Sequence, residues 1–86
     1  MPAISIFFGI VIKMYFNDHP PPHFHAEHQG RKGAFDFNGR MVAGDIESKT
    51  ALVLIKKWVI RHKHELMVNW KNVEMKRPLN QIAPLE

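Results

Sequence analysis

Cysteine is absent from this chain of 86 residues. The absence excludes disulfide bonds and thiolate zinc sites, so any bound metal must be held by histidine, aspartate or glutamate. It is compatible with the reducing cytosol, where few proteins carry disulfides. We therefore expect a cytoplasmic protein that is not held together by disulfides or thiolate zinc.

The chain also lacks an apolar run that is long enough to span a membrane. The most apolar segment, residues 4–16, is interrupted by Lys13 and falls short of the roughly 20 residues that a membrane helix needs. It has neither the positively charged leader nor the small-residue cleavage site of a signal peptide. We expect a structural strand here and no contact with a membrane.

The remaining composition is that of an ordinary globular protein, with 45% apolar and 23% charged residues. The length suits one domain, 1–86, and such a chain buries only about 60–65% of its unfolded surface, so most apolar residues must serve a single core. The formal net charge of +4 favours polyanionic partners, nucleic acid first, although many small domains are this basic.

Four segments are predicted to be strands: residues 8–16, 23–29, 34–37 and 40–43. The first has large apolar residues at every even position, which is the period of a half-buried strand. Gly30-Arg31-Lys32-Gly33 is predicted to be a turn, and Asn38-Gly39 is a strong hairpin signal because both residues tolerate a positive φ. These segments predict an antiparallel meander of three or four strands.

A long amphipathic helix is predicted over residues 49–75, which contain neither proline nor glycine. Ser48 is the expected N-cap, and Pro78 ends the helix. A break is expected near His62-Lys63-His64, where three polar residues stand together. The apolar residues at helical spacing include Ala51, Leu52, Ile55, Trp58, Val59, Leu66, Trp70 and Val73.

A sheet with one apolar face and a helix with one apolar stripe bury both when they pack together. We therefore expect an α+β fold of two layers, an antiparallel sheet of three to four strands packed on one long C-terminal helix. Ile82 and Leu85 keep apolar positions beyond this helix. The tail, residues 79–86, is accordingly expected to dock on the sandwich.

Histidine is concentrated in one stretch, Asp18-His19-Pro20-Pro21-Pro22-His23-Phe24-His25-Ala26-Glu27-His28, which holds four of the six histidines. Histidine can donate or accept a hydrogen bond, transfer a proton near neutral pH, or bind a metal. The prolines fix φ and force the residue before them into extended geometry, so His19 is expected on a stiff turn. The stretch is the leading candidate for a functional site.

His23 and His25 are two residues apart on the predicted second strand. In a strand they share one face, with Cα atoms about 6.5–7 Å apart, while Phe24 and Ala26 face the core. His28 faces away from the pair. Two neighbouring imidazoles on one face suit joint binding of a metal or of an anionic ligand.

Three interpretations of this cluster are open. As a metal site, His19, His23 and His25 provide three ligands for a divalent transition metal, with Glu27 as an alternative third ligand. As a structural cluster, the histidines pair with backbone and with carboxylates such as Asp18. As a metal-free RNA-cleaving site, two imidazoles act as general acid and base beside a phosphate.

Cations beside the cluster would assist RNA binding: Lys13, Arg31 and Lys32. The predicted helix carries a second basic set away from its apolar stripe: Lys56, Lys57, Arg61, Lys63 and Lys71. This set is either a solvated helix face or a surface that binds along the phosphate backbone of a nucleic acid. No phosphate-binding loop, nucleophile elbow or zinc-finger spacing accompanies it.

Three polar residues interrupt the apolar stripe of the helix: His62, Glu65 and Asn69. A buried polar group without a partner costs about 1–3 kcal/mol, so each needs a hydrogen bond. His62 is either a core histidine bonded to backbone or, with Glu65 and Asn69, part of a cleft shared with the histidine strand. In the second case the cleft combines a base, an acid and an amide.

Motifs along nearly the whole chain resemble a small bacterial family of uncharacterised domains. In the N-terminal half they are Met1-Pro2, Ile4, Phe7-Phe8-Gly9-Ile10, Met14-Tyr15-Phe16, Asp18-His19 and Pro21-Pro22-His23-Phe24-His25-Ala26. In the helix and tail they are Ala51-Leu52, Trp58, His62, Glu65-Leu66, Asn69-Trp70 and Ile82-x-Pro84-Leu85. The chain differs from this pattern at Pro20 and His28.

The resemblance implies no established activity. It implies a gene arrangement in which a second small protein is encoded alongside, similar to toxin–antitoxin pairs, and hence a partner protein and a role related to nucleic acid. The family's motif positions in this chain are His19, His23, His25, His62, Glu65 and Asn69.

Our leading hypothesis is one component of a toxin–antitoxin-like pair, with a ligand or active-site cleft that acts on RNA. The candidate catalytic residues are His19, His23, His25, His62 and Glu65. The rival hypothesis is a non-enzymatic interaction module with structural histidines, which uses its sheet edge or its helix to bind a partner protein or a second copy of itself.

Overall fold

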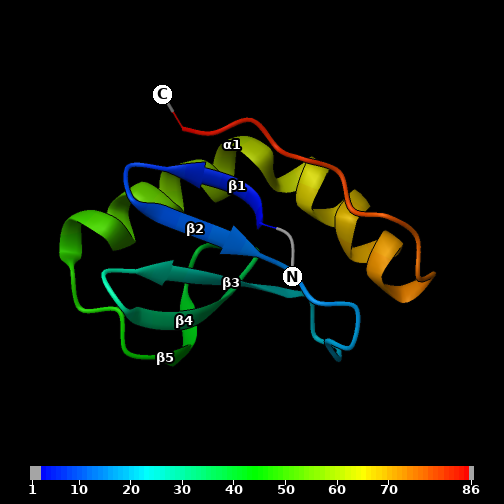
Figure 1. Ribbon diagram of the computed structural model, residues 1–86, viewed down its shortest axis with the longest axis horizontal. Coiled ribbons are helices and arrows are strands. Elements are labelled where there is room, and N and C mark those ends of the chain that lie inside the picture. The colour runs from blue at the N-terminus through cyan, green and yellow to red at the C-terminus, as the bar shows by residue number, and fades with distance from the viewer. Residues whose placement is uncertain (1–2, 86) are drawn as a thin grey trace.

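The computed structural model describes residues 3–85, which form one antiparallel sheet with a long helix across one of its faces (Figure 1). The elements are β1 (Ala3–Phe7), β2 (Ile10–Lys13), β3 (His23–His28), β4 (Arg31–Asp36), β5 (Met41–Gly44) and α1 (Lys49–Glu74). The strand order is β1-β2-β3-β4-β5, a simple meander. The α+β class is confirmed, but the sheet has five strands and not the three to four predicted.

The additional strand arises because the apolar N-terminal segment folds back on itself. A turn at Phe8 (φ 48°) and Gly9 (φ 77°) separates β1 from β2. Two consecutive positive φ angles suit a tight hairpin, but phenylalanine rarely adopts one, which hid the turn. The alternation in residues 8–16 holds for Ile10, Ile12 and Met14, which are buried, whereas Phe8 is 62% exposed.

The second turn also differs from the prediction. The chain reverses at Gln29 and Gly30, so Arg31 and Lys32 already belong to β4 instead of to the turn. The turn between β4 and β5 lies at Asn38-Gly39 as predicted, since Asp36 pairs with the chain beyond it. There the Asp36 carboxylate accepts hydrogen bonds from the amides of Asn38 and Arg40, both at 2.9 Å.

Helix α1 begins and bends where the sequence indicated. The Ser48 hydroxyl accepts a hydrogen bond from the Ala51 amide at 3.1 Å, the bond expected of an N-cap. His62 leaves helical geometry (φ −118°, ψ 23°) and kinks the helix at the predicted break. Among residues 3–85, α1 falls short of the apolar length that a membrane-crossing helix needs.

The core lies between the sheet and α1, with Trp58 at its centre. The Trp58 ring lies 5.8 Å from that of Phe24 on β3 and 5.5 Å from that of Phe7 on β1, measured between centroids. Phe35 stacks on Phe24 at 5.5 Å. Other fully buried core residues include Ile4, Ile10, Ile12, Met14, Ala26, Ile55, Val59 and Leu66.

The tail docks as predicted, alongside α1 and β1 (Figure 1). Ile82 is buried, and its amide donates a hydrogen bond to the carbonyl of Ile4 on β1 at 2.8 Å. The side chain of Asn69 on α1 exchanges two hydrogen bonds, each of 2.9 Å, with the backbone of Asn80. The tail therefore covers the edge of β1, while β5 keeps its outer edge open.

Candidate functional site

The alternation of β3 separates its core residues from its histidines. Phe24 and Ala26 are fully buried beneath α1, as predicted, whereas His23 and His25 are only half-buried. The ring centroids of the two histidines lie 5.1 Å apart, with their planes at 76°. His23 is the first residue of the strand, and its ring also lies 5.5 Å from that of Trp70 on α1.

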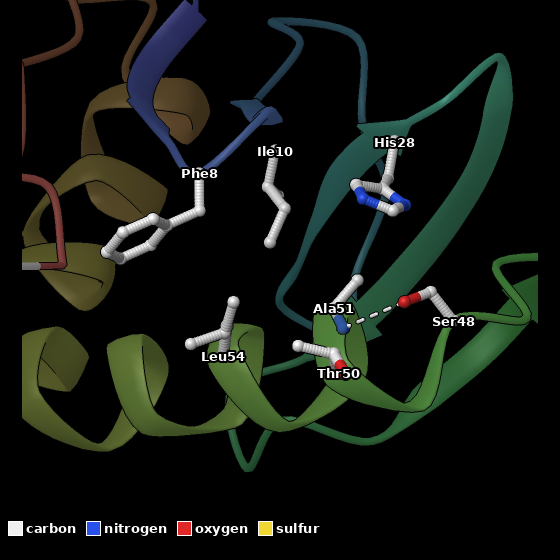
Figure 2. A pocket seen from close by; sticks show the side chains of 7 residues that line it. All are labelled: Phe8, Ile10, His28, Ser48, Thr50, Ala51 and Leu54. Carbon is white, nitrogen blue, oxygen red and sulfur yellow. Dashed lines mark hydrogen bonds between the residues drawn. The ribbon is translucent and has the colours of Figure 1, made fainter.

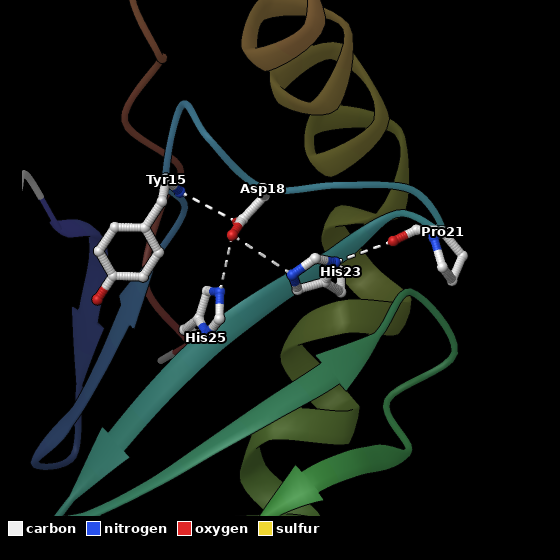
Figure 3. Close-up of polar contacts among 5 residues, drawn as sticks. All are labelled: Tyr15, Asp18, Pro21, His23 and His25. Carbon is white, nitrogen blue, oxygen red and sulfur yellow. Dashed lines mark hydrogen bonds and ion pairs between the residues drawn. The ribbon is translucent and has the colours of Figure 1, made fainter.

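Asp18, in the loop between β2 and β3, joins the two histidines. Its Oδ1 atom lies 3.2 Å from Nε2 of His25 and 3.5 Å from Nε2 of His23, so both imidazoles converge on one carboxylate oxygen (Figure 3). We call these three residues the Asp18–His23–His25 cluster. Their side chains are only 10%, 20% and 30% exposed, in that order, so the cluster is shielded on several sides but still reaches solvent.

Each member of the cluster is held in place by a neighbour. The amide of Tyr15 donates a hydrogen bond to Oδ2 of Asp18 at 3.2 Å, and the Tyr15 ring packs edge-on against His25 at 4.7 Å. Nδ1 of His23 lies 2.9 Å from the carbonyl of Pro21, to which it donates its proton, because a carbonyl can only accept. The proline turn thus orients His23 and fixes its tautomer.

Two hollows flank the cluster on the sheet and share Ala34, whose small side chain leaves room between them. The first, of about 270 Å³, lies between His25 and Lys32. The second, of about 330 Å³, is bordered by His23 and by the exposed His19. A ligand bound across the cluster therefore has space on both sides.

Two of the cations expected near the cluster are already paired. Lys13 lies 2.9 Å from Glu27, and their hydrogen bond lowers the pKa of the Glu27 carboxyl and raises the pKa of the Lys13 amine. Arg31, the first residue of β4, lies 3.3 Å from the carboxylate of Asp45. Lys32, which borders the first hollow, is the cation best placed to meet a bound anion.

The structure brings His62 and Glu65 together, but at a separate place. Nδ1 of His62 lies 2.6 Å from Oε1 of Glu65, and the His62 ring packs on Trp58 at 5.7 Å. Nε2 of His62 is buried without a hydrogen-bond partner. No hydrogen bond, ion pair or ring contact found within residues 3–85 joins this pair to His19, His23 or His25. Asn69, the third polar residue of the stripe, is occupied by the tail.

His28 faces away from the cluster, as predicted. It pairs in register with Ile10, on the core side of the sheet. There it borders an apolar hollow of about 310 Å³ between the β1–β2 turn and the first turn of α1 (Figure 2). Phe8 and Leu54 form much of its wall, so this hollow offers few groups for chemistry.

The sequence interpretation missed Asp18 as the centre of the cluster and named it only as a partner for structural histidines. A signal was present. β2 and β3 are antiparallel neighbours, so the loop that connects them lies at the end of the sheet where β3 begins. Asp18 is the acidic residue of that loop, and it precedes His23 by five residues.

The fold and the site define a small α+β protein with a histidine–aspartate cluster beside its sheet hollows. The chain belongs to the family described as Domain of unknown function (DUF4160), whose model matches residues 9–71 and thus includes the whole cluster. Searches of curated proteins and of solved structures each found no match. The resemblance to a family of uncharacterised domains is thereby confirmed.

Proposed function

We propose that the protein acts through the Asp18–His23–His25 cluster, that its substrate is RNA, and that it works as one component of a toxin–antitoxin-like pair. The observation that supports the site is the convergence of two imidazole nitrogens on one carboxylate oxygen, at 3.2 and 3.5 Å, between two hollows. The inference that a second component exists rests on the family resemblance alone.

A phosphodiester suits the dimensions and the charge of this site. One ring nitrogen of His23 and one of His25 lie within 4.8 Å of each other, so both can face a single phosphate group. The hollows give a nucleotide space on either side, and Lys32 offers a positive charge at the border of one of them. The net charge of +4 favours the approach of a polyanion.

Replacing His23 and His25 together with alanine is expected to reduce cleavage of a single-stranded RNA oligonucleotide at least about 100-fold, the lower range for loss of side-chain proton transfer. The measurement is the initial cleavage rate on a denaturing gel, with circular dichroism to check folding. A double His28→Ala/His64→Ala variant is the matched control, because it removes two histidines outside the cluster. Undiminished cleavage by the His23→Ala/His25→Ala variant would contradict the proposed site. If that variant instead unfolds, the role of the cluster is structural.

A second candidate function is a non-enzymatic interaction module, and exposed apolar residues on α1 favour it. Val53, Ile60 and Met67 recur every seventh residue and are 52%, 67% and 41% exposed, which forms an apolar stripe along the helix. The open edge of β5 carries Val42, which is 61% exposed. Surfaces of this kind mark protein interfaces more often than catalytic sites.

If the stripe is a self-association surface, the wild-type chain is expected to be a dimer and the Ile60→Glu variant a monomer, since a buried unpaired carboxylate disfavours association. Size-exclusion chromatography with light scattering measures both masses. Arg61→Glu is the control, because Arg61 is exposed on the same helix but lies about 100° around the helix axis from Ile60. If the wild-type chain has the mass of a monomer at high concentration, self-association through α1 is contradicted.

A further inference from the structure

The three atoms at the heart of the cluster form the ligand set of a metal site. Asp18, His23 and His25 each offer one ligand atom, a carboxylate oxygen or a ring nitrogen, and these three atoms all lie within 4.8 Å of one another. We propose that they bind one divalent transition-metal ion, with Asp18 and not the expected His19 as the third ligand. This inference rests on the proposed function in one respect, because it uses the same site. It adds the cofactor that this site would bind.

The tautomer of His23 is the first argument for a cation at this point. Because Nδ1 of His23 donates to the Pro21 carbonyl, Nε2 of the neutral ring carries a lone pair and no proton. That lone pair faces a carboxylate oxygen 3.5 Å away. Two acceptors facing each other repel unless a cation removes the repulsion, either a second ring proton on Nε2 of His23 or a metal ion bound by the three atoms.

The distances are the second argument. A transition metal binds imidazole nitrogen and carboxylate oxygen at about 2.0–2.2 Å, so two of its ligand atoms stand roughly 3.0–3.5 Å apart in octahedral or tetrahedral geometry. The separations from Oδ1 of Asp18 are 3.2 Å to His25 and 3.5 Å to His23. The two pairs that include Asp18 are therefore already spaced for a shared ion, and the histidine nitrogens, within 4.8 Å of each other, need at most a small adjustment.

The surroundings of the ligands are the third argument. Metal-binding histidines almost always donate their other ring proton to a carbonyl or carboxylate, and metal-binding carboxylates are hydrogen-bonded in turn. His23 has this bond to Pro21, and Asp18 has it through Oδ2 to the amide of Tyr15 (Figure 3). These two bonds leave Nε2 of His23 and Oδ1 of Asp18 facing the centre of the cluster, where Oδ1 lies within hydrogen-bond distance of Nε2 of His25, and Tyr15 holds the ring of His25.

Two imidazoles and one carboxylate select the class of metal. Nitrogen-rich sites favour zinc and the first-row transition metals, whereas magnesium and calcium prefer oxygen ligands alone. Three protein ligands leave coordination positions open, and these open positions would face the hollows beside His19 and Lys32. A water bound there becomes a strong nucleophile, which is the role metals play in the hydrolysis of phosphate esters.

Titration calorimetry of the tag-free chain of 86 residues with Zn²⁺ tests the site. We expect one ion per chain, and at least about 100-fold weaker binding in Asp18→Ala and in His25→Ala, because each removes a direct ligand. His19→Ala and His28→Ala are matched controls that should keep the wild-type affinity. Co²⁺ should bind with a visible absorption band that changes in Asp18→Ala, and Mg²⁺ should not compete.

Failure of the wild-type chain to bind Zn²⁺ or Co²⁺ overturns the metal site, as does wild-type affinity in Asp18→Ala. If Asp18→Ala unfolds, Asp18→Asn, which keeps the shape of the side chain, takes its place. RNA cleavage separates the two proposals. RNA cleavage that persists in the presence of a chelator would show that the proposed function does not need the metal. Stoichiometric metal binding by a chain that leaves RNA intact would support the metal site and contradict RNA as its substrate.

Discussion

Replacing Trp58 with alanine is expected to lower the free energy of unfolding by about 3–5 kcal/mol, the largest loss for any single core side chain. Trp58 is fully buried, and it contacts Phe7 and Phe24 from two strands and His62 from its own helix. Its Nε1 atom also donates a hydrogen bond to the carbonyl of Ala83 in the tail, at 3.0 Å. One side chain therefore links sheet, helix and tail.

The loss has two physical components. Removal of the indole leaves a cavity that the surrounding rings fill only in part, and it leaves the Ala83 carbonyl without its donor. Since small domains have a total free energy of unfolding of about 5–15 kcal/mol, a large share of the stability would disappear. The variant should unfold at much lower urea concentration in circular dichroism.

Two further variants serve as an intermediate and as a surface control. Trp58→Phe keeps an aromatic ring but not the N–H group, so it should fall between the wild type and Trp58→Ala. Val53→Ala shortens an exposed side chain on the same helix and should stay within about 0.5 kcal/mol of the wild type. A loss below about 1 kcal/mol in Trp58→Ala would show that the core does not depend on this ring.

Most of the fold could be predicted because its signals are local. Ser48 identifies the start of the helix, the polar run at His62 its kink, and the alternation of Phe24 and Ala26 the core side of β3. The turn at Phe8 could not be predicted in this way. Its positive φ falls on a bulky residue that the alternating pattern assigns to a strand, and tertiary structure overrides that local preference.

The candidate site was predictable only where neighbours along the chain meet. His23 and His25 approach each other because a strand repeats every two residues. The contact of both with Asp18 depends on how the proline loop returns over the sheet, which the sequence does not specify. The placement of His62 with Glu65 follows from the kinked helix, whose buried stripe packs on the core side of the sheet, where His25 does not point.

Replacing Gly44 with alanine is expected to lower the free energy of unfolding by about 2–5 kcal/mol, the sum of backbone strain and overpacking. Gly44 ends β5 with φ at 111°, and a Cβ atom there would lie 2.4 Å from both Cα of Gly33 and the carbonyl oxygen of Lys32. Both atoms belong to the backbone of β4, so neither can move aside without distorting the sheet.

Gly30→Ala is the matched control for this variant, because Gly30 has φ at 78° but open space around the position of its Cβ. It should lose only the cost of the left-handed conformation, about 1–2 kcal/mol. The difference between the two melting curves isolates the clash with β4. Because Gly44 and Gly33 both line the hollow beside His25, the same variant should weaken any ligand bound there, whereas Gly30→Ala should not. Equal destabilisation by the two substitutions would mean that β5 moves freely against β4, and that the hollow is not a rigid binding surface.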